Sequence, residues 1–203
     1  MSIERRRHLR ELSLQVLFFI DSVHPEIIGK PARLFPVINN ENAQKDFEPR
    51  SKLVRKGVRK KILNKKPVIE TTTEHIKQSE KISDQERLES GTKLLIEFWN
   101  NFKKSTQGQD FFLLLTQGVI QHIFEIDKKI ETFSNNWKIE RMTCVDRNIM
   151  RISVFEILYC SDIPYKVSIN EAVDIGKTFG TKDSGSFING VLDSIRISIE
   201  TSH

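Results

Sequence analysis

Residues 143–200 read TCVDRNIMRISVFEILYCSDIPYKVSINEAVDIGKTFGTKDSGSFINGVLDSIRISIE, and this stretch decides the fold. Its apolar residues recur every three or four positions in three successive blocks, which is the period of an amphipathic helix. Thr143 is typical of a residue that opens a helix, and Ser168 and Glu171 form the S-x-x-E spacing of a capping box. Gly180 stands where a left-handed residue would end the second helix. The stretch therefore predicts three consecutive helices.

The same helical period extends outward from this stretch. It covers residues 5–20, about four turns after Gly91, and a long segment over residues 110–133. Glycine and proline together make up 15 of 203 residues, which is about 7%, whereas their usual combined share is ~12%. Few turn-forming residues favour long helices over many short strands, so we expect an all-α helical bundle.

Residues 36–90 differ from the rest of the chain. They are polar and charged, they show no sustained period, and they hold 13 basic and 9 acidic residues. Within them, Arg50–Lys66 carries nine Lys or Arg and no acid. Loops of this length are uncommon in compact domains, so we expect a disordered basic insertion within a single domain that spans 1–203. The basic run has two interpretations, a solvated segment or a source of non-specific attraction to RNA.

The overall composition excludes several classes of protein. The net charge is +5 and the pI is about 9.2, which allows an interaction with nucleic acid. The chain shows neither a secretory leader nor an apolar run of membrane-spanning length, so we expect a soluble, cytoplasmic protein. Cys144 and Cys160 form no metal-binding pattern and are expected to be reduced thiols. We expect no catalytic residues, no metal and no cofactor.

The first candidate binding feature is Arg5, Arg6 and Arg7 with Arg10, at the start of the first helix. The positive end of a helix dipole disfavours cations there by roughly 0.3–1 kcal/mol each. One interpretation is a solvated helix start, and the other is a cluster that binds phosphates, since the arginine fork matches phosphate oxygens.

The second candidate feature is the segment from Phe179 to Phe187, which includes Lys182, Asp183 and Ser184. Either Asp183 or Ser184 is expected to cap the last helix. A cation, hydroxyls, free amides and a ring are the groups that typically hold single-stranded RNA. The alternative is a well-capped interhelical turn whose phenylalanine lies in the core.

Four segments of the chain resemble the NusB family of transcription antitermination factors. Arg5–Phe18 resembles the Arg-rich opening of that family, which is followed by an R-E-x-x-x-Q-x-L pattern. Val145–Ile152 is similar to its V-[DE]-[RK]-x-[IV]-[LM]-R-[IL] helix, and Ile163–Ala172 to its [IV]-P-x-K-V-[AS]-I-N-E-A motif. Phe187–Asp193 is similar to F-[IV]-N-G-[VI]-L-D. The resemblance covers residues 5–34 and about 91–200, and it omits 36–90.

The resemblance implies an all-α fold of two small helical subdomains and a function without catalysis. It implies binding to single-stranded boxA RNA together with the small-subunit ribosomal protein NusE, and assembly on RNA polymerase that suppresses premature termination, notably in ribosomal RNA operons. It assigns residues to two contact surfaces. Those expected to contact RNA are Arg6, Arg7, Arg10, Lys182, Asp183, Ser184 and Phe187. Those expected to face the ribosomal protein are Phe18 and Asp146.

The sequence departs from the family pattern at two places. Phe18 stands where relatives often carry tyrosine, so any hydroxyl contact at that place is lost. Gly185–Ser186 replaces a pair that is often bulkier and basic, so we expect one RNA contact fewer there. Two other functions stay open. One is a helical protein-interaction module without sequence-specific RNA binding. The other is the N-terminal domain of an RNA cytosine methyltransferase, although the 203 residues hold no cofactor-binding domain.

Overall fold

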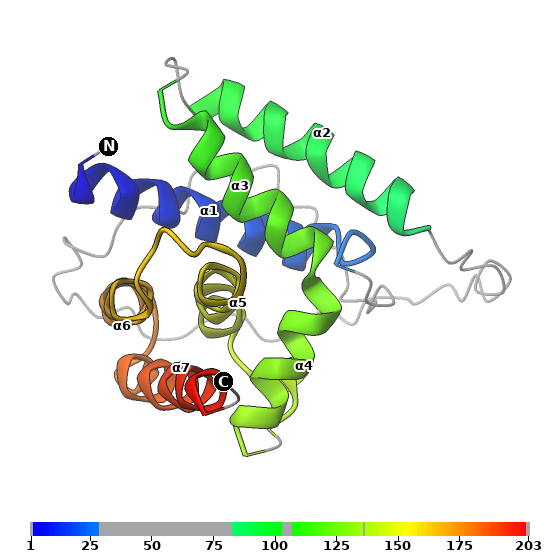
Figure 1. The fold of residues 1–203 in the computed structure, drawn as a ribbon. Helices are drawn as coiled ribbons and strands as arrows, with labels where there is room; N and C mark the ends of the chain where they lie inside the picture. Colours follow the sequence, from blue (N-terminus) through cyan, green and yellow to red (C-terminus); the bar gives the residue numbers. More distant parts are fainter. Residues whose placement is uncertain (1, 29–82, 103–106, 136, 202–203) are drawn as a thin grey trace, which may run out of the picture. The chain divides into compact units, whose positions relative to one another are not determined.

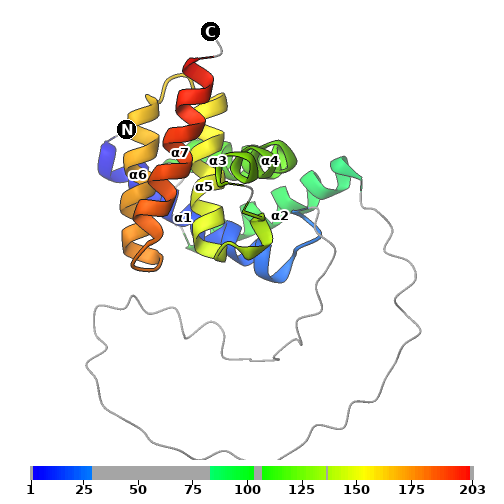
Figure 2. The same ribbon diagram turned by 90° about the horizontal axis from the view of Figure 1, so that it is seen from below.

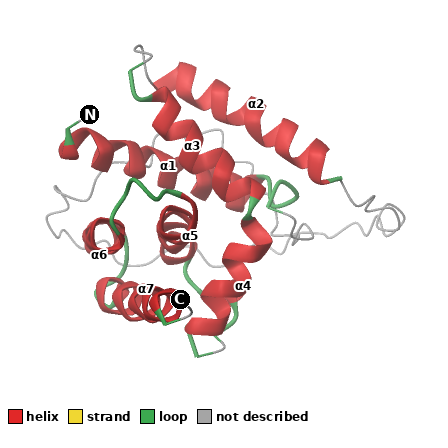
Figure 3. Ribbon diagram, viewed as in Figure 1, coloured by secondary structure: helices red, strands yellow, loops and turns green. Residues whose placement is uncertain are grey.

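The computed structural model describes residues 2–28, 83–102, 107–135 and 137–201. Figure 3 shows that the regular structure of these residues is helical throughout, without a strand, so the predicted all-α class is confirmed. The elements are α1 (Ile3–Val23), α2 (Asp84–Phe102), α3 (Gln109–Gln121), α4 (Ile123–Phe133), the 3₁₀ turn η1 (Ile139–Arg141), α5 (Cys144–Tyr159), α6 (Tyr165–Phe179) and α7 (Ser184–Glu200).

The helices pack as two groups that share one core (Figures 1 and 2). Helices α1, α2 and α3 pack on one another, and α4, α6 and α7 gather around α5, which also contacts α1 and α3. Every residue of α5 from Asn148 to Ile157 is buried, because α5 has neighbours on all sides. No helix of the described residues has the length and apolarity needed to cross a membrane.

The long helix predicted over 110–133 is two helices, and this prediction was wrong. The backbone leaves the helical region at His122, with φ −103° and ψ 18°, and the chain turns from α3 into α4. The apolar stripe before the break packs on α1, α2 and α5, whereas the stripe after it packs on α5 and α7. The apolar period is continuous, but its two halves serve different partners, so tertiary packing sets the break.

Two expectations about helix ends also require correction. Ser168 does not cap α6, because that helix already starts at Tyr165 after Pro164, and Ser168 is buried inside it. Gly180 is not left-handed but extended, with φ −91° and ψ −161°. A side chain at Gly180 would still be excluded, since its Cβ would collide with Ser184. The predicted cap at Thr143 is confirmed, since its hydroxyl accepts a hydrogen bond from the Asp146 amide (3.0 Å).

The C-terminal boundary predicted for the insertion, residue 90, lies inside a helix, so this boundary was placed too late in the chain. Helix α2 already begins at Asp84, where Ser83 and Glu86 form a reciprocal cap: the Ser83 amide donates to Glu86 Oε2 (2.9 Å), and the Glu86 amide donates to Ser83 Oγ (3.2 Å). The rest of the predicted insertion, including the basic run Arg50–Lys66, lies outside the described residues.

A buried charged network ties the end of α1 to α4 and α5. Arg151 has no exposed surface, and its guanidinium donates to Asp127 Oδ1 and Oδ2 (both 2.7 Å) and to Asp21 Oδ2 (2.9 Å). Arg147 also donates to Asp21, and the Asn148 amide donates to the same oxygen (3.1 Å). The polar residues of the α5 motif therefore serve the fold and face away from solvent.

Candidate nucleic-acid interface

The outer arginines of α1 are accessible. Arg5 is exposed and has no ion pair within the described residues. Arg6 has a side chain that is 35% exposed, its Nη2 lies 3.9 Å from Asp162 Oδ2, and its guanidinium lies 5.5 Å from the centre of the Phe111 ring. An ion pair of that length at the surface contributes little, so both guanidinium groups can meet an anion.

Arg7 is largely occupied by carboxylates of α6. Its Nε donates to Glu171 Oε2 (2.9 Å), and its Nη2 donates to Glu171 Oε1 (2.7 Å) and to Asp174 Oδ2 (2.9 Å). These hydrogen bonds raise the pKa of Arg7 above its ordinary value. Glu171, which the sequence placed in a capping box, instead holds the start of α1 against α6.

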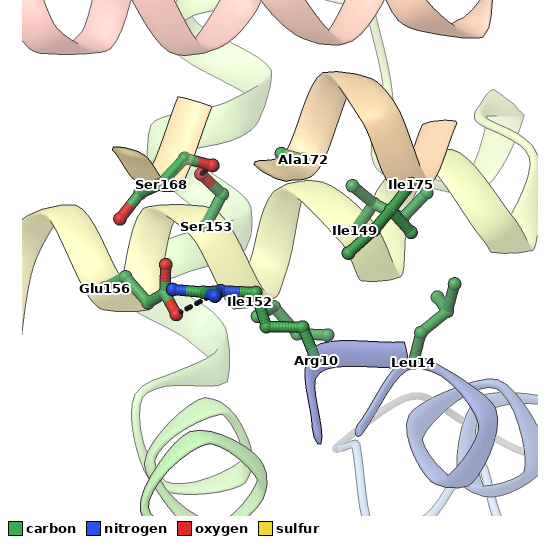
Figure 4. Close-up of a pocket in the computed structure, with 9 residues that line it drawn as sticks. All are labelled: Arg10, Leu14, Ile149, Ile152, Ser153, Glu156, Ser168, Ala172 and Ile175. Carbon is green, nitrogen blue, oxygen red and sulfur yellow. Dashed lines mark hydrogen bonds and ion pairs between the residues drawn. The ribbon is translucent and has the colours of Figure 1, made fainter. Parts of the chain in front are cut away.

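Arg10 is not on the surface, so the expectation that it contacts an RNA phosphate was wrong. The residue is 3% exposed, and its Nε donates to Glu156 Oε1 (2.8 Å) in the interior between α1, α5 and α6 (Figure 4). Its Nη1 lies 3.7 Å from Glu171 Oε2. Burial is the main cause that raises the pKa of Glu156, and the nearby guanidinium opposes it.

The loop between α6 and α7 presents some of its predicted residues and buries another. Lys182 and Asp183 are exposed, but Ser184 is buried, where its hydroxyl accepts a hydrogen bond from the Thr181 amide (2.7 Å). Ser184 therefore stabilises the turn between α6 and α7, and the expectation that it contacts RNA was wrong. Asp183 occupies the cap position of α7 without a side-chain cap hydrogen bond.

The stem of Lys177 lies beside Gly185. A Cβ at Gly185 would lie 3.0 Å from Cγ of Lys177, so the glycine makes room for the lysine stem. The side chain of Lys177 is 66% exposed, and its ammonium lies 3.8 Å from Asp174 Oδ1. The stem of Lys177 thus fills the space that a larger side chain at position 185 would need.

Phe187 is half-buried in the first turn of α7. It packs against the core on one side and against Trp137 on the other, with ring centroids 5.8 Å apart and planes at 59°. Phe187 therefore packs on the core, as one alternative predicted, and part of its ring is also exposed, as an RNA-binding ring would require. Trp137 is 52% exposed and was missed as a functional candidate, although an isolated tryptophan in a polar stretch was a signal for it.

The two residues expected to face the ribosomal protein have different environments. Phe18 is 39% exposed and the next residue, Phe19, is 43% exposed, so α1 presents two aromatic side chains to solvent. Asp146 is only 5% exposed, so its side chain offers little surface to a partner, and its position toward the ribosomal protein stays a prediction. The described residues hold no cluster of three or more His, Cys, Asp or Glu that could bind a metal.

Comparison with known proteins identifies the family. The sequence model of the NusB family matches residues 74–196, more than half of the chain.

The chain belongs to the NusB family.

Two proteins named transcription antitermination protein NusB are close relatives. The one from Desulfatibacillum aliphaticivorans is 55% identical over 100 residues, covering 49% of this chain and 70% of the relative. The one from Desulforapulum autotrophicum is 53% identical over 110 residues, covering 53% of this chain and 77% of the relative.

Solved structures show the same fold. NusB from T. maritima superposes with a TM-score of 0.57 at 20% identity, over 95% of this chain and 90% of that one. A chain from the crystal structure of a plectonemic RNA supercoil gives a TM-score of 0.51 at 28% identity, over 55% of this chain and 82% of that one. The NusB family match spans α2 to α7, whereas the arginines of α1 lie before it.

Proposed function

We propose that this chain is a transcription antitermination factor that binds boxA-type single-stranded RNA together with the ribosomal protein NusE. In this role it acts without catalysis, in the cytoplasm, within an assembly on RNA polymerase that suppresses premature termination, notably in ribosomal RNA operons. The observation that carries the proposal is the identity of 55% to a protein named for antitermination. The structure supports it with exposed cations and rings at the starts of α1 and α7.

The RNA surface we propose is smaller than the sequence suggested. It contains Arg5 and Arg6 on α1, Lys177 at the end of α6, and Lys182 with Phe187 beside the start of α7. Asp183 lies among these residues, where its carboxylate can accept hydrogen bonds from base amino groups. Arg7 is not counted in this surface, but its hydrogen bonds to Glu171 and Asp174 hold the start of α1 against α6.

The partner surface we propose is the exposed apolar face of Phe18 and Phe19 on α1. Exposed rings of this kind are enriched at the centres of protein interfaces. Phe18 lacks a hydroxyl, so its contribution to NusE binding would come from buried apolar area.

The test is fluorescence anisotropy with a labelled boxA-like single strand and a scrambled strand, each with and without NusE. We expect a preference for boxA that increases with NusE. If about three cations contact phosphates, log affinity should fall with log salt at a slope of about −2, at ~−0.7 per contact. Equal binding of the two strands, both with and without NusE, would refute the proposal.

A matched pair of variants separates the proposal from the alternative of a protein-interaction module. Arg5→Ala/Arg6→Ala removes exposed cations from the proposed surface, and Lys93→Ala/Lys128→Ala removes two exposed cations elsewhere. We expect the first variant to weaken RNA binding at least tenfold and the second to leave it within twofold. Under the alternative, the two variants would bind RNA equally and NusE binding would persist in both.

A further inference from the structure

A groove of about 600 Å³ runs between the end of α4, the turn η1 and the first half of α7. Helices α4 and α7 lie side by side there (Figure 1). Phe133, Trp137 and Phe187 supply the aromatic lining of the groove, and the rings of Trp137 and Phe187 contact one another. Lys138 and Arg141 line it from η1, and Gly190 lines it from α7. The residues assigned above to RNA binding include only Phe187 from this groove.

The aromatic wall is suited to a flat ring. Trp137 is 52% exposed, and its plane stands at 59° to that of Phe187, so the two rings are not stacked face to face. Aromatic side chains in this position serve as stacking platforms for bases of single strands, because every base has a π face.

The charge of the groove is positive. Lys138 and Arg141 are exposed and have no ion pair within the described part of the chain, and no carboxylate lines the groove. The neighbouring carboxylates are engaged elsewhere: Glu131 accepts a hydrogen bond from the Ile139 amide (2.9 Å), and Asp193 accepts one from Arg196 (2.9 Å). Glu140, on the same turn, is exposed but lies outside the lining. This charge complements a polyanion.

Gly190 has no structural reason to be a glycine. It lies inside α7 with an ordinary helical backbone, and a Cβ there would meet no atom within 4 Å. A glycine inside a helix lowers helix stability relative to alanine. Its one local consequence is a bare strip of backbone on the groove, which a flat ligand can approach closely.

We propose that this groove binds a nucleobase of the single-stranded RNA, with Trp137 as the stacking platform and Gly190 as the floor. Lys138 and Arg141 then contact the phosphates on either side of that base. This inference rests on the proposed function and extends its RNA surface from the start of α7 to η1. The aromatic pair joins the two parts, since Phe187 belongs to both.

The chain offers an internal reporter for the test. It has two tryptophans, of which Trp99 is 3% exposed in the core and Trp137 faces the groove. In a Trp99→Phe background all tryptophan emission comes from Trp137. We expect titration with the boxA-like strand to quench this emission and to shield it from acrylamide. An emission unchanged at saturating RNA would overturn the inference.

Affinity measurements on variants give the second readout. We expect Trp137→Ala to weaken binding of the boxA-like strand by about 5- to 100-fold, in the range measured for loss of base stacking. Gly190→Ala should weaken it at least fivefold while raising the melting temperature, an outcome that a merely structural glycine would not produce. Arg141→Ala should weaken binding and reduce the salt slope by ~0.7, and Lys128→Ala serves as its control.

The outcomes distinguish this inference from the proposed function. If the wild-type protein prefers boxA but Trp137→Ala and Gly190→Ala both bind within twofold of it, the groove inference fails and the function stands. If the wild-type protein binds no single strand, both fail. If Trp137→Ala weakens NusE binding without RNA and leaves RNA binding unchanged, the groove is a protein interface and the inference is overturned.

Discussion

Removing Arg10 should destabilise the fold without removing an RNA contact. The guanidinium and the Glu156 carboxylate are 3% and 1% exposed, and they meet at 2.8 Å. The substitution Arg10→Met keeps most of the side-chain volume but leaves the carboxylate buried without its cation. Breaking one partner of a buried ion pair costs about 3–5 kcal/mol, and the burial of both groups leaves no solvent screening to reduce this cost. We therefore expect the free energy of unfolding to fall by about that amount.

The double variant Arg10→Met/Glu156→Met tests the cause of that loss. Replacing both members of a buried ion pair by apolar residues of similar volume is often neutral or stabilising. We expect the double variant to recover most of the lost free energy, because no uncompensated charge remains. Glu171 keeps its bonds to Arg7 in both variants, so its role is unchanged.

The assays are urea unfolding followed by circular dichroism and RNA anisotropy on the folded double variant. We expect RNA affinity within twofold of the wild-type protein and an unchanged salt slope. A loss of less than about 1 kcal/mol in the single variant would refute the structural reasoning. A well-folded double variant with tenfold weaker RNA binding and a salt slope reduced by ~0.7 would restore Arg10 as a phosphate contact.

Three further predictions concern stability, and urea unfolding measures each of them. The folded pKa of Glu156 is raised, so its contribution is present below the unfolded value of ~4.3 and is lost as pH rises through the folded pKa. Arg10 opposes that rise, so Arg10→Met should raise the folded pKa of Glu156 further, and its deficit should shrink as pH falls from 7 to 5; an equal deficit at both pH values would contradict this. Gly118→Ala should cost about 1–3 kcal/mol or more, because its Cβ would collide with the Phe155 ring, and an unchanged midpoint would count against that contact. Arg151→Met leaves Asp127 without its cation, whereas Asp21 keeps Arg147, so it should cost about 3 kcal/mol, and a loss below about 1 kcal/mol would show that water and Arg147 compensate the carboxylates.

The positions of most helices follow from the apolar period, but their ends do not. The last three helices lie where the sequence placed them, because each has a full stripe and a clear break at Pro164 or Gly180. The S-x-x-E spacing of Ser168 and Glu171 misled because residues three apart also share a helix face. That face meets α1, and Glu171 serves the arginines there instead of the helix start.

The sequence predicted the types of residue in the candidate site, but it did not predict which of their side chains are exposed to solvent. Four arginines at the start of a helix were interpreted as one cluster, because the sequence does not show that Glu156, Glu171 and Asp174 face them from helices about 150 residues away. The groove at Trp137 was missed for a related reason. It forms only where the end of α4, η1 and α7 meet, and no single segment shows that meeting.

The arginines of α1 therefore divide into two pairs with different tasks. Arg7 and Arg10 face carboxylates of α5 and α6 and hold the helix in place, which also offsets the unfavourable interaction of cations with the positive end of the helix dipole. Arg5 and Arg6 extend beyond them toward solvent. A variant that removes all four would combine a loss of folding with a loss of RNA binding, and a variant at Arg7 would remove the hydrogen bonds that tie α1 to Glu171 and Asp174. Only the outer pair reports on RNA alone, because its removal leaves no buried charge unpaired.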